Sequence, residues 1–210
     1  FIASVFNSKW NASGQIPERA VNSGFISRFD AIDNTEGGYT GRINTSVKLN
    51  TILKNKTALE NHFYYSKYHF NLFSNFTFFL NDPVNGDQIK QREARDLFGY
   101  QIKLSFDKDK GNLNLKSVYG AGFRTDKTTG SELSRTLNKT TLLSNIQLGD
   151  IDETNVFIFS DKNISIGKWL FNIGNRVDYF NFNYYDKITQ QQLSRQSKII
   201  YSPKFSVQHT

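Results

Sequence analysis

Residues 72–91 read LFSNFTFFLNDPVNGDQIKQ, and this stretch joins two signals of opposite kind. Up to Leu80 it is an aromatic, β-prone run with interleaved polar residues, which is typical of a strand. From Asn81 onward it becomes a polar loop that contains the turn-forming pairs DP and NG. The stretch therefore predicts a long strand that leaves an apolar zone and ends in a water-exposed loop.

A strict alternation of apolar and polar residues runs through much of the chain. In residues 98–106 every even position is apolar and every odd position is polar or small, as in a strand with one apolar face. The same pattern predicts strands at eight places: residues 1–10, 41–52, 57–80, 92–106, 112–124, 154–164, 169–183 and 198–209.

The connections between these strands alternate in length. Short turns are expected at residues 53–55, 107–111 and 166–168, and long polar loops at 11–40, 81–91, 126–153 and 185–196. Residues 136–148 also have strand character, which is compatible with a hairpin inside their loop. Short turns at one end and long loops at the other are typical of outer-membrane barrels. The pattern predicts an all-β, antiparallel up-and-down transmembrane β-barrel.

Composition favours this class over a soluble β-sandwich. Aromatic residues make up 15% of the chain although its mean hydropathy is only −0.52, and a barrel with a wet interior combines these two properties. Sandwich strands average about 5–6 residues, and those expected here are mostly about twice as long. On a barrel wall, the apolar residues should face lipid: Tyr100, Ile102, Leu104, Leu113, Leu115, Phe171 and Ile173. The polar residues should face the lumen: Gln101, Lys103, Asn114 and Lys116.

Residues 11–40 carry two further motifs, SGQIPERAV and FISRFDAIDNTEGG. Together with residues 72–91, they resemble the barrel of TonB-dependent outer-membrane receptors. Loops of the form SGQIPERAV and runs of the form LFSNFTYFLDDPVNGDQ recur in that family. The resemblance implies that residues 1–210 form a segment of about eight strands of a 22-stranded barrel. We see no plug domain or signal peptide and no Met, so we expect a piece of a longer precursor.

The family resemblance also implies a function. We expect energy-coupled uptake of a scarce solute, with an iron–siderophore complex as the leading candidate. The expected partners are outer-membrane lipid and lipopolysaccharide, the solute, and TonB of the inner membrane acting through a plug. Extracellular loops would capture the solute before the plug is displaced. The alternatives are a passive porin-like channel and a soluble carbohydrate-binding β-sandwich.

Three arginines are the candidate binding residues. Arg19 and Arg28 lie in the first long loop, and Arg92 follows the second. A guanidinium offers charge and paired donors to a carboxylate, so these residues are expected to contact an anionic solute. The alternative for any one of them is that it braces its loop through a nearby acid: Asp30, Asp82 or Asp87.

The sequence offers little for catalysis, metals or nucleic acid. It lacks Cys, GxSxG, a P-loop and HExxH, so we expect neither an enzyme nor a cofactor.

His62 and His69 are seven residues apart and should lie on opposite faces of a strand, where they cannot share a metal. Residues 30–36 offer oxygen ligands for calcium, but they do not match an EF-hand loop, so a purely structural loop is the expectation. The net charge of +7 is dispersed, which argues against a nucleic-acid partner.

Overall fold

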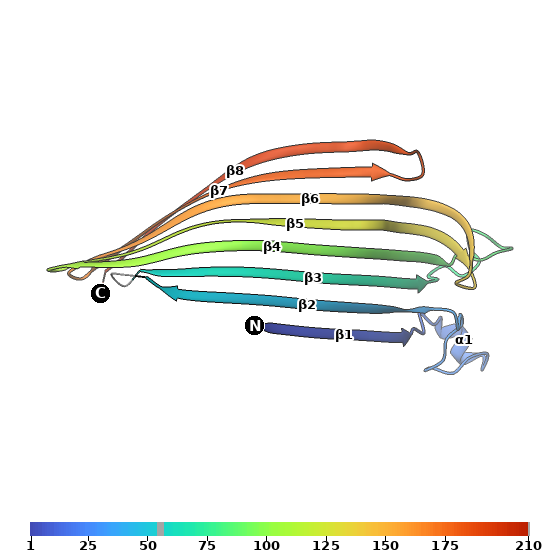
Figure 1. Cartoon of the computed structure of the whole chain (residues 1–210). Helices are drawn as coiled ribbons and strands as arrows, with labels where there is room; N and C mark the ends of the chain where they lie inside the picture. Colours follow the sequence, from blue (N-terminus) through green and yellow to red (C-terminus); the bar gives the residue numbers. More distant parts are fainter. Residues whose placement is uncertain (54–56, 210) are drawn as a thin grey trace.

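The computed structural model describes residues 1–53 and 57–209. They form one eight-stranded sheet in which every strand pairs antiparallel with the next along the chain (Figure 1). The strands are β1 (Ile2–Asn11), β2 (Gly37–Ile52), β3 (Ala58–Ser74), β4 (Ile89–Lys110), β5 (Leu113–Leu137), β6 (Thr141–Ile166), β7 (Trp169–Asp186) and β8 (Gln191–His209). A short helix, α1 (Glu18–Asn22), lies between β1 and β2. No helix among the described residues is long and apolar enough to cross a membrane.

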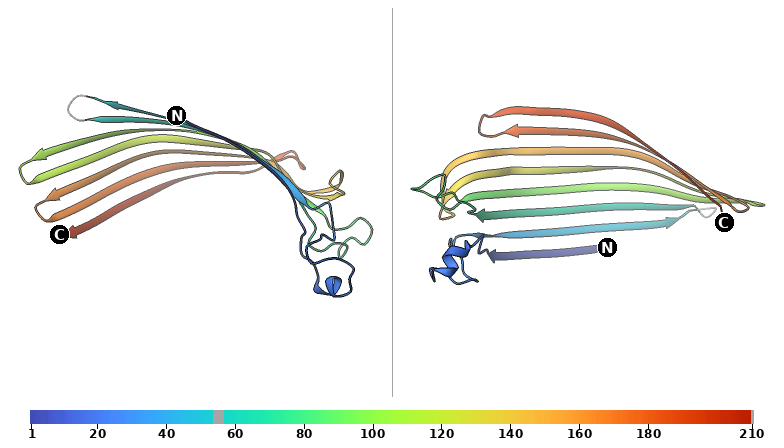
Figure 2. Two further views of the ribbon diagram at one scale, coloured as in Figure 1. Left: turned by 90° about the horizontal axis from the view of Figure 1, so that it is seen from below. Right: turned by 180° about the vertical axis from the view of Figure 1, so that it is seen from behind.

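The eight predicted strands and their up-and-down order are confirmed. The sheet is strongly curved and twisted, and β1 and β8 lie at its two edges (Figure 2). Because neighbouring strands are antiparallel, successive connections alternate between the two ends of the sheet (Figure 1). We call the end that carries residues 12–36, 75–88, 138–140 and 187–190 the loop rim, and the other end the turn end.

The register confirms how the residues divide between the two faces. Residues directly opposite each other in an antiparallel pair project from the same face. Tyr100 lies opposite Phe63 and Phe123, and its ring centroid is 4.5 Å from that of Phe63. Followed across the sheet, this register places all seven residues expected to face lipid on one face. The four residues expected to face the lumen lie on the other.

The apolar face carries no protein layer. Its side chains are exposed or half-buried, with Ile158 at 60% exposure and Phe205 at 68%. Among the described residues the only buried hydrophobic side chain is Phe73, so the sheet has almost no core of its own. A soluble sandwich would bury this face against a second sheet. Here a single sheet presents it uncovered, as a barrel wall in lipid does.

Rings on the polar face pack directly over glycines of the neighbouring strand. Tyr64 lies opposite Gly99, where a Cβ would be 2.1 Å from the Tyr64 ring. Phe157 likewise lies opposite Gly122, where a Cβ would be 2.6 Å from the ring. Glycine is required at both positions because any side chain would displace the ring. The ring also covers the backbone that glycine leaves exposed.

Several predicted boundaries are wrong at the loop rim. The strand expected at residues 57–80 ends at Ser74. The loops expected at residues 126–153 and 185–196 shrink to tight turns at 138–140 and 187–190, because β5, β6, β7 and β8 continue through them. Three register shifts interrupt the β5–β6 pair in this extension. The long loops at the rim are therefore residues 12–36 and 75–88.

The turn end agrees better with the sequence. The turns predicted at residues 107–111 and 166–168 are present, and each contains a glycine with positive φ, Gly111 at +58° and Gly167 at +58°. The first is tighter than expected, because β4 continues to Lys110. The turn predicted at residues 53–55 lies partly outside the described residues, although Leu53 N–H donates to the Thr57 carbonyl at 2.7 Å.

Candidate functional site

The loop rim is held together by one buried side chain. Gln88 is 3% exposed and closes the second loop where β4 begins. Its Nε2 donates to Thr35 Oγ1 of the first loop. Its Oε1 accepts from Thr136 Oγ1 at 3.0 Å and from Lys139 N–H at 2.8 Å, at the β5–β6 turn. Gln88 therefore connects three segments that are distant in the sequence.

The second loop is organised around a carboxylate. Asp87 accepts from Thr77 Oγ1 at 2.7 Å, from Asn81 N–H at 2.9 Å and from Asp82 N–H at 2.9 Å. Burial acts to raise the pKa of Asp87, but these hydrogen bonds outweigh it and lower the pKa below its ordinary value. Asp82 repeats the arrangement on a smaller scale by accepting from Asn85 N–H at 2.9 Å. These contacts explain why β3 stops at Ser74: the chain beyond it folds back around Asp87.

Two acids of the first loop lie together where β2 begins. Asp33 accepts from Thr35 N–H at 2.8 Å and from Asn75 Nδ2 at 2.9 Å. Burial acts to raise the pKa of Asp33, and its hydrogen bonds outweigh that effect and lower it. Glu36 is only 2% exposed, and the backbone N–H of Asn75 acts to lower its pKa. Burial raises the pKa of Glu36, and the nearby charge of Asp33 raises it further. Of the calcium candidates in residues 30–36, Asp30 lies apart, exposed and bonded to Ser27.

A cavity of about 200 Å³ with a mixed polar and apolar lining lies between the two loops and the β5–β6 turn. Amide and carboxylate side chains dominate its wall, and two aromatic rings close it. The polar lining residues are Asp33, Asn34, Asn75, Asn85, Gln88 and Asn138, and the rings are Phe78 and Phe79. The cavity provides hydrogen-bond donors and acceptors together with apolar surface, but it is smaller than most small-molecule sites.

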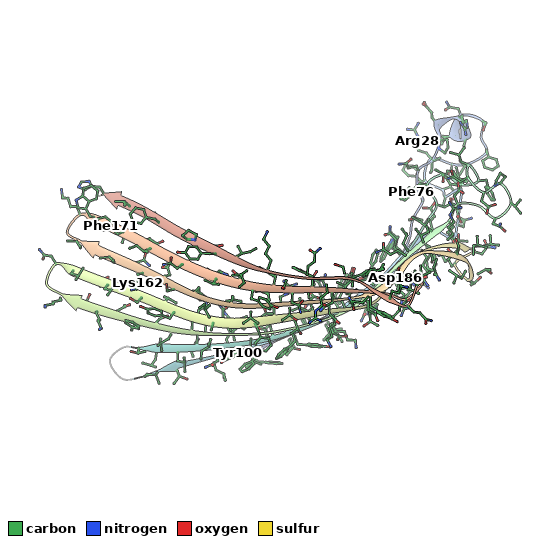
Figure 3. All side chains as sticks on the ribbon, turned by 90° about the horizontal axis from the view of Figure 1, so that it is seen from above. Arg28, Phe76, Tyr100, Lys162, Phe171 and Asp186 are labelled. Atoms are coloured by element: carbon green, nitrogen blue, oxygen red, sulfur yellow. The ribbon has the colours of Figure 1, made fainter. Side chains whose placement is uncertain are left out.

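The structure does not bring the three predicted arginines into one site. Arg19 lies in α1, and Arg28 lies on the same projecting loop, at the opposite end of the molecule from Phe171 (Figure 3). Arg92 lies within β4, opposite Asn71 and Glu132. All three are exposed, and no ion pair between described residues includes any of them. Their role in solute contact remains a prediction.

The acids expected to brace these arginines have other partners. Asp30 accepts from Ser27 at 3.3 Å. The carboxylate of Asp82 accepts hydrogen bonds from the backbone N–H groups of Val84 and Asn85. The carboxylate of Asp87 accepts from its own loop, through the N–H of Asn81. The loops are thus braced through backbone and amide donors, and the guanidinium groups are left exposed at the rim.

A second set of charged residues lies on the polar face of the sheet. Asp126 is 2% exposed and accepts from Arg95 and Arg124. On β7, Arg176 donates to Asp178 at 2.7 Å through both Nε and Nη2. The Arg176 guanidinium carbon also lies 4.0 Å from the centroid of the Phe157 ring on β6. Neither pair was among the predicted site residues, although the sequence carries a signal for both. Arg-x-Asp at residues 124–126 and 176–178 places both charges on one face of a strand.

Metal sites formed by acids and histidines alone are absent from the described residues: no group of three or more His, Cys, Asp or Glu could hold an ion. His62 and His69 lie on opposite faces, as predicted. His62 lies opposite Gln101 on the polar face, where its Nε2 is 2.9 Å from Ser46 Oγ. His69 lies opposite Gly41 and Ala94 on the other face.

No protein-family model matches the sequence, and no curated protein matches it. A structural match exists to the ferric citrate transporter FecA in its unliganded form, with a TM-score of 0.80 at 12% sequence identity. The match covers 98% of this chain and 30% of the FecA chain. The sheet has the fold of part of the FecA barrel.

The match to FecA, a TonB-dependent receptor, bears out the predicted fold. All eight strands of the FecA-like sheet fall within the matched region, since only 2% of the chain is left uncovered. At 12% identity the likeness is one of fold, so the expectation that the chain is not an enzyme remains a prediction. The chain spans about 30% of the length of the FecA chain.

Proposed function

We propose that this chain is part of an outer-membrane receptor that takes up a scarce solute by active transport. The single observation that carries the proposal is the match of the whole eight-stranded sheet to the FecA barrel. By analogy with FecA, the leading solute class is a ferric complex such as an iron–siderophore. TonB would supply the energy by displacing a plug that belongs to the parent protein and lies outside this chain.

The two free edges of the sheet support a place within a larger closed barrel. In the described structure β1 and β8 each pair on one side only, and every residue of β8 except Ser194 is exposed. Unpaired edges of such length are templates for aggregation, and barrels remove them by closure. Further strands on both sides would pair these edges. The uncovered apolar face would then meet outer-membrane lipid, with lipopolysaccharide at the rim.

The loop rim is suited to ligand capture. Gln88 and Asp87 hold two long loops in fixed positions, and rigidly supported loops are where binding residues concentrate. Arg19 and Arg28 are exposed in the first loop, and no ion pair among the described residues includes either, so their charge is available to an anionic solute. Arg92 is also exposed, but it lies opposite Glu132 and on the same face of β4 as Tyr100. A ferric complex with carboxylate ligands has the matching charge.

A passive porin-like channel is the rival, and energy dependence separates the two. The gene should be deleted and restored in its host, and uptake of radiolabelled ferric complexes measured under iron limitation. An active receptor requires the gene, TonB and the proton-motive force, and uptake should stop when any one is removed. Uptake that needs the gene but persists without TonB would establish the passive channel. If loss of the gene leaves uptake of every ferric complex unchanged, this solute class is wrong.

A further inference from the structure

Three oxygen atoms beside the first loop are buried without any hydrogen-bond partner. They are Glu36 Oε1, Ser74 Oγ and Asn75 Oδ1. Glu36 is 2% exposed, and Ser74 and Asn75 are each 5% exposed. A buried polar atom without a partner is destabilising, and more so if it is charged. A bound species among these residues would supply the missing partners.

The three residues are neighbours across the start of the β2–β3 pair. Gly37 lies opposite Phe73, so Glu36 and Ser74 occupy the next positions along. Asn75 lies beside both carboxylates: its backbone N–H lies close enough to Glu36 to lower that pKa, and its Nδ2 donates to Asp33 Oδ2 at 2.9 Å. The other polar atom of that side chain, Asn75 Oδ1, has no hydrogen-bond partner.

Backbone of the first loop closes over the Glu36 carboxylate. Gly14 has φ +60°, and a Cβ there would lie 2.5 Å from Glu36 Oε1. The close approach explains why a glycine stands at this position of SGQIPERAV. No ion pair among the described residues includes Asp33 or Glu36. Two acids therefore lie side by side with no positive charge to balance them.

A proton and a cation are the two ways to balance the charge of these acids, and they differ in how many of the unpartnered oxygens they satisfy. A proton on Glu36 neutralises one carboxylate and supplies one donor, which leaves most of the orphaned oxygens unpartnered. A metal ion satisfies several oxygens at once. Carboxylate, amide carbonyl and hydroxyl oxygens in an irregular arrangement suit calcium better than magnesium, which demands near-ideal octahedral geometry.

We propose a calcium site formed by Glu36, Asn75, Ser74 and Asp33. The ion would fasten the first loop to the end of β3, next to the Gln88 contacts. It involves two acids only, together with amide and hydroxyl oxygens, so it differs from a site built from acids and histidines alone. The proposal does not depend on the transport function. A site of this kind at a water-exposed rim should bind in the range of about 10⁻⁴–10⁻³ M, as extracellular calcium modules do.

The test is calcium titration of the complete protein in detergent, followed by calorimetry and by thermal unfolding with CaCl₂ or EDTA. We expect calcium to bind, to raise the Tm, and to slow proteolysis of residues 12–36, with magnesium much less effective. Glu36→Gln keeps the shape and removes the charge, and it should weaken calcium binding about tenfold or more. Asn75→Ala provides a second variant should Glu36→Gln fold poorly, and it should weaken binding in the same direction.

Asp30→Asn is the matched control, because Asp30 belongs to the same loop but is exposed and outside the cluster. Its calcium response should equal that of the parent protein. Absence of any calcium effect on the parent protein would overturn the proposal and leave a protonated Glu36 as the explanation. An unchanged calcium affinity in both Glu36→Gln and Asn75→Ala would also overturn it, by placing the ion elsewhere.

Discussion

The carboxylate of Asp126 accepts two hydrogen bonds from the guanidinium of Arg95, with Nε 2.5 Å from Oδ1 and Nη2 2.6 Å from Oδ2. Arg124 adds a third at 2.7 Å. The acid is 2% exposed, whereas the side chains of Arg95 and Arg124 are 36% and 44% exposed. One buried acid thus joins β4 and β5 on the polar face and holds two cations that partly face water.

Asp126→Asn should destabilise the protein by about 2 kcal/mol, because it removes a buried charge and leaves two neighbouring cations facing each other. The free energy of unfolding, from urea titration in lipid or detergent, measures the loss. Lys67→Gln is the control, since Lys67 lies 3.9 Å from Asp96 in a pair that is more than half exposed on the lysine side. That change should cost less than about 1 kcal/mol. Equal losses of unfolding free energy in the two variants would show that the burial of Asp126 does not strengthen its ion pairs.

Leu104→Arg should destabilise the membrane-inserted protein by about 2–4 kcal/mol, the cost of a lipid-facing cation near the midplane. Leu104 lies opposite Leu59 and Tyr119 on the uncovered apolar face. Gln101→Arg places the same charge in the same strand but on the polar face, and it should cost much less. Folding titrations into lipid vesicles compare the two. A Leu104→Arg protein that folds as well as Gln101→Arg would rule out lipid contact at this face.

Gln88→Ala should loosen the loop rim while the strands remain intact. The change leaves the Lys139 N–H and the Thr136 hydroxyl without their acceptor, at a cost of about 1–3 kcal/mol. Limited proteolysis should cleave residues 12–36 and 75–88 faster, with unchanged β-sheet circular dichroism. Gln91→Ala, three residues away and exposed, is the control and should leave the cleavage rate as it is. Equal protection in the two variants would contradict the role assigned to Gln88.

Acid should loosen the second loop, and Asp87 should account for part of that effect. The pKa of Asp87 is lower in the folded protein than its ordinary value of 3.8. The charged Asp87 carboxylate therefore stabilises the fold fully at pH values above its pKa in the unfolded chain. This stabilisation is lost as the pH falls through its lower pKa in the folded protein. Protease resistance of residues 75–88, measured with an acid-active protease, should fall below about pH 4. Asp87→Asn should be less resistant at pH 7 and show a smaller decrease with acid. Asp82 and Asp33, whose pKa values are also lowered, supply the remainder.

Arg19→Gln, Arg28→Gln and Arg92→Gln should each weaken binding of an anionic ferric complex if that arginine contacts it. Loss of one charged hydrogen bond corresponds to about tenfold in affinity. Lys110→Gln, exposed at the turn end, is the control that should bind normally. Tm measurements exclude a loss caused by unfolding. Unchanged affinity at all three arginines would place the solute elsewhere on the receptor.

The alternation of residue types was sufficient to determine the number of strands, their order and the division of side chains between two faces. A strand repeats every two residues, so the face of Tyr100 or Gln101 follows from local sequence alone. The turns at Gly111 and Gly167 are local for a similar reason, since positive φ favours glycine. These features do not depend on contacts with distant parts of the chain.

The tertiary structure decided what happens at the loop rim. Residues 126–132 are polar or glycine on both faces and read as a loop, yet they continue β5 because β4 and β6 supply hydrogen-bonding partners on either side. The roles of Gln88 and Glu36 depend on segments that are brought together only by folding, as Gln88 meets Thr35 from 53 residues away. Hydrogen bonds and buried charges of this kind leave no periodic signal in the sequence. Their partners are set by strand register and loop packing, which only the folded chain defines.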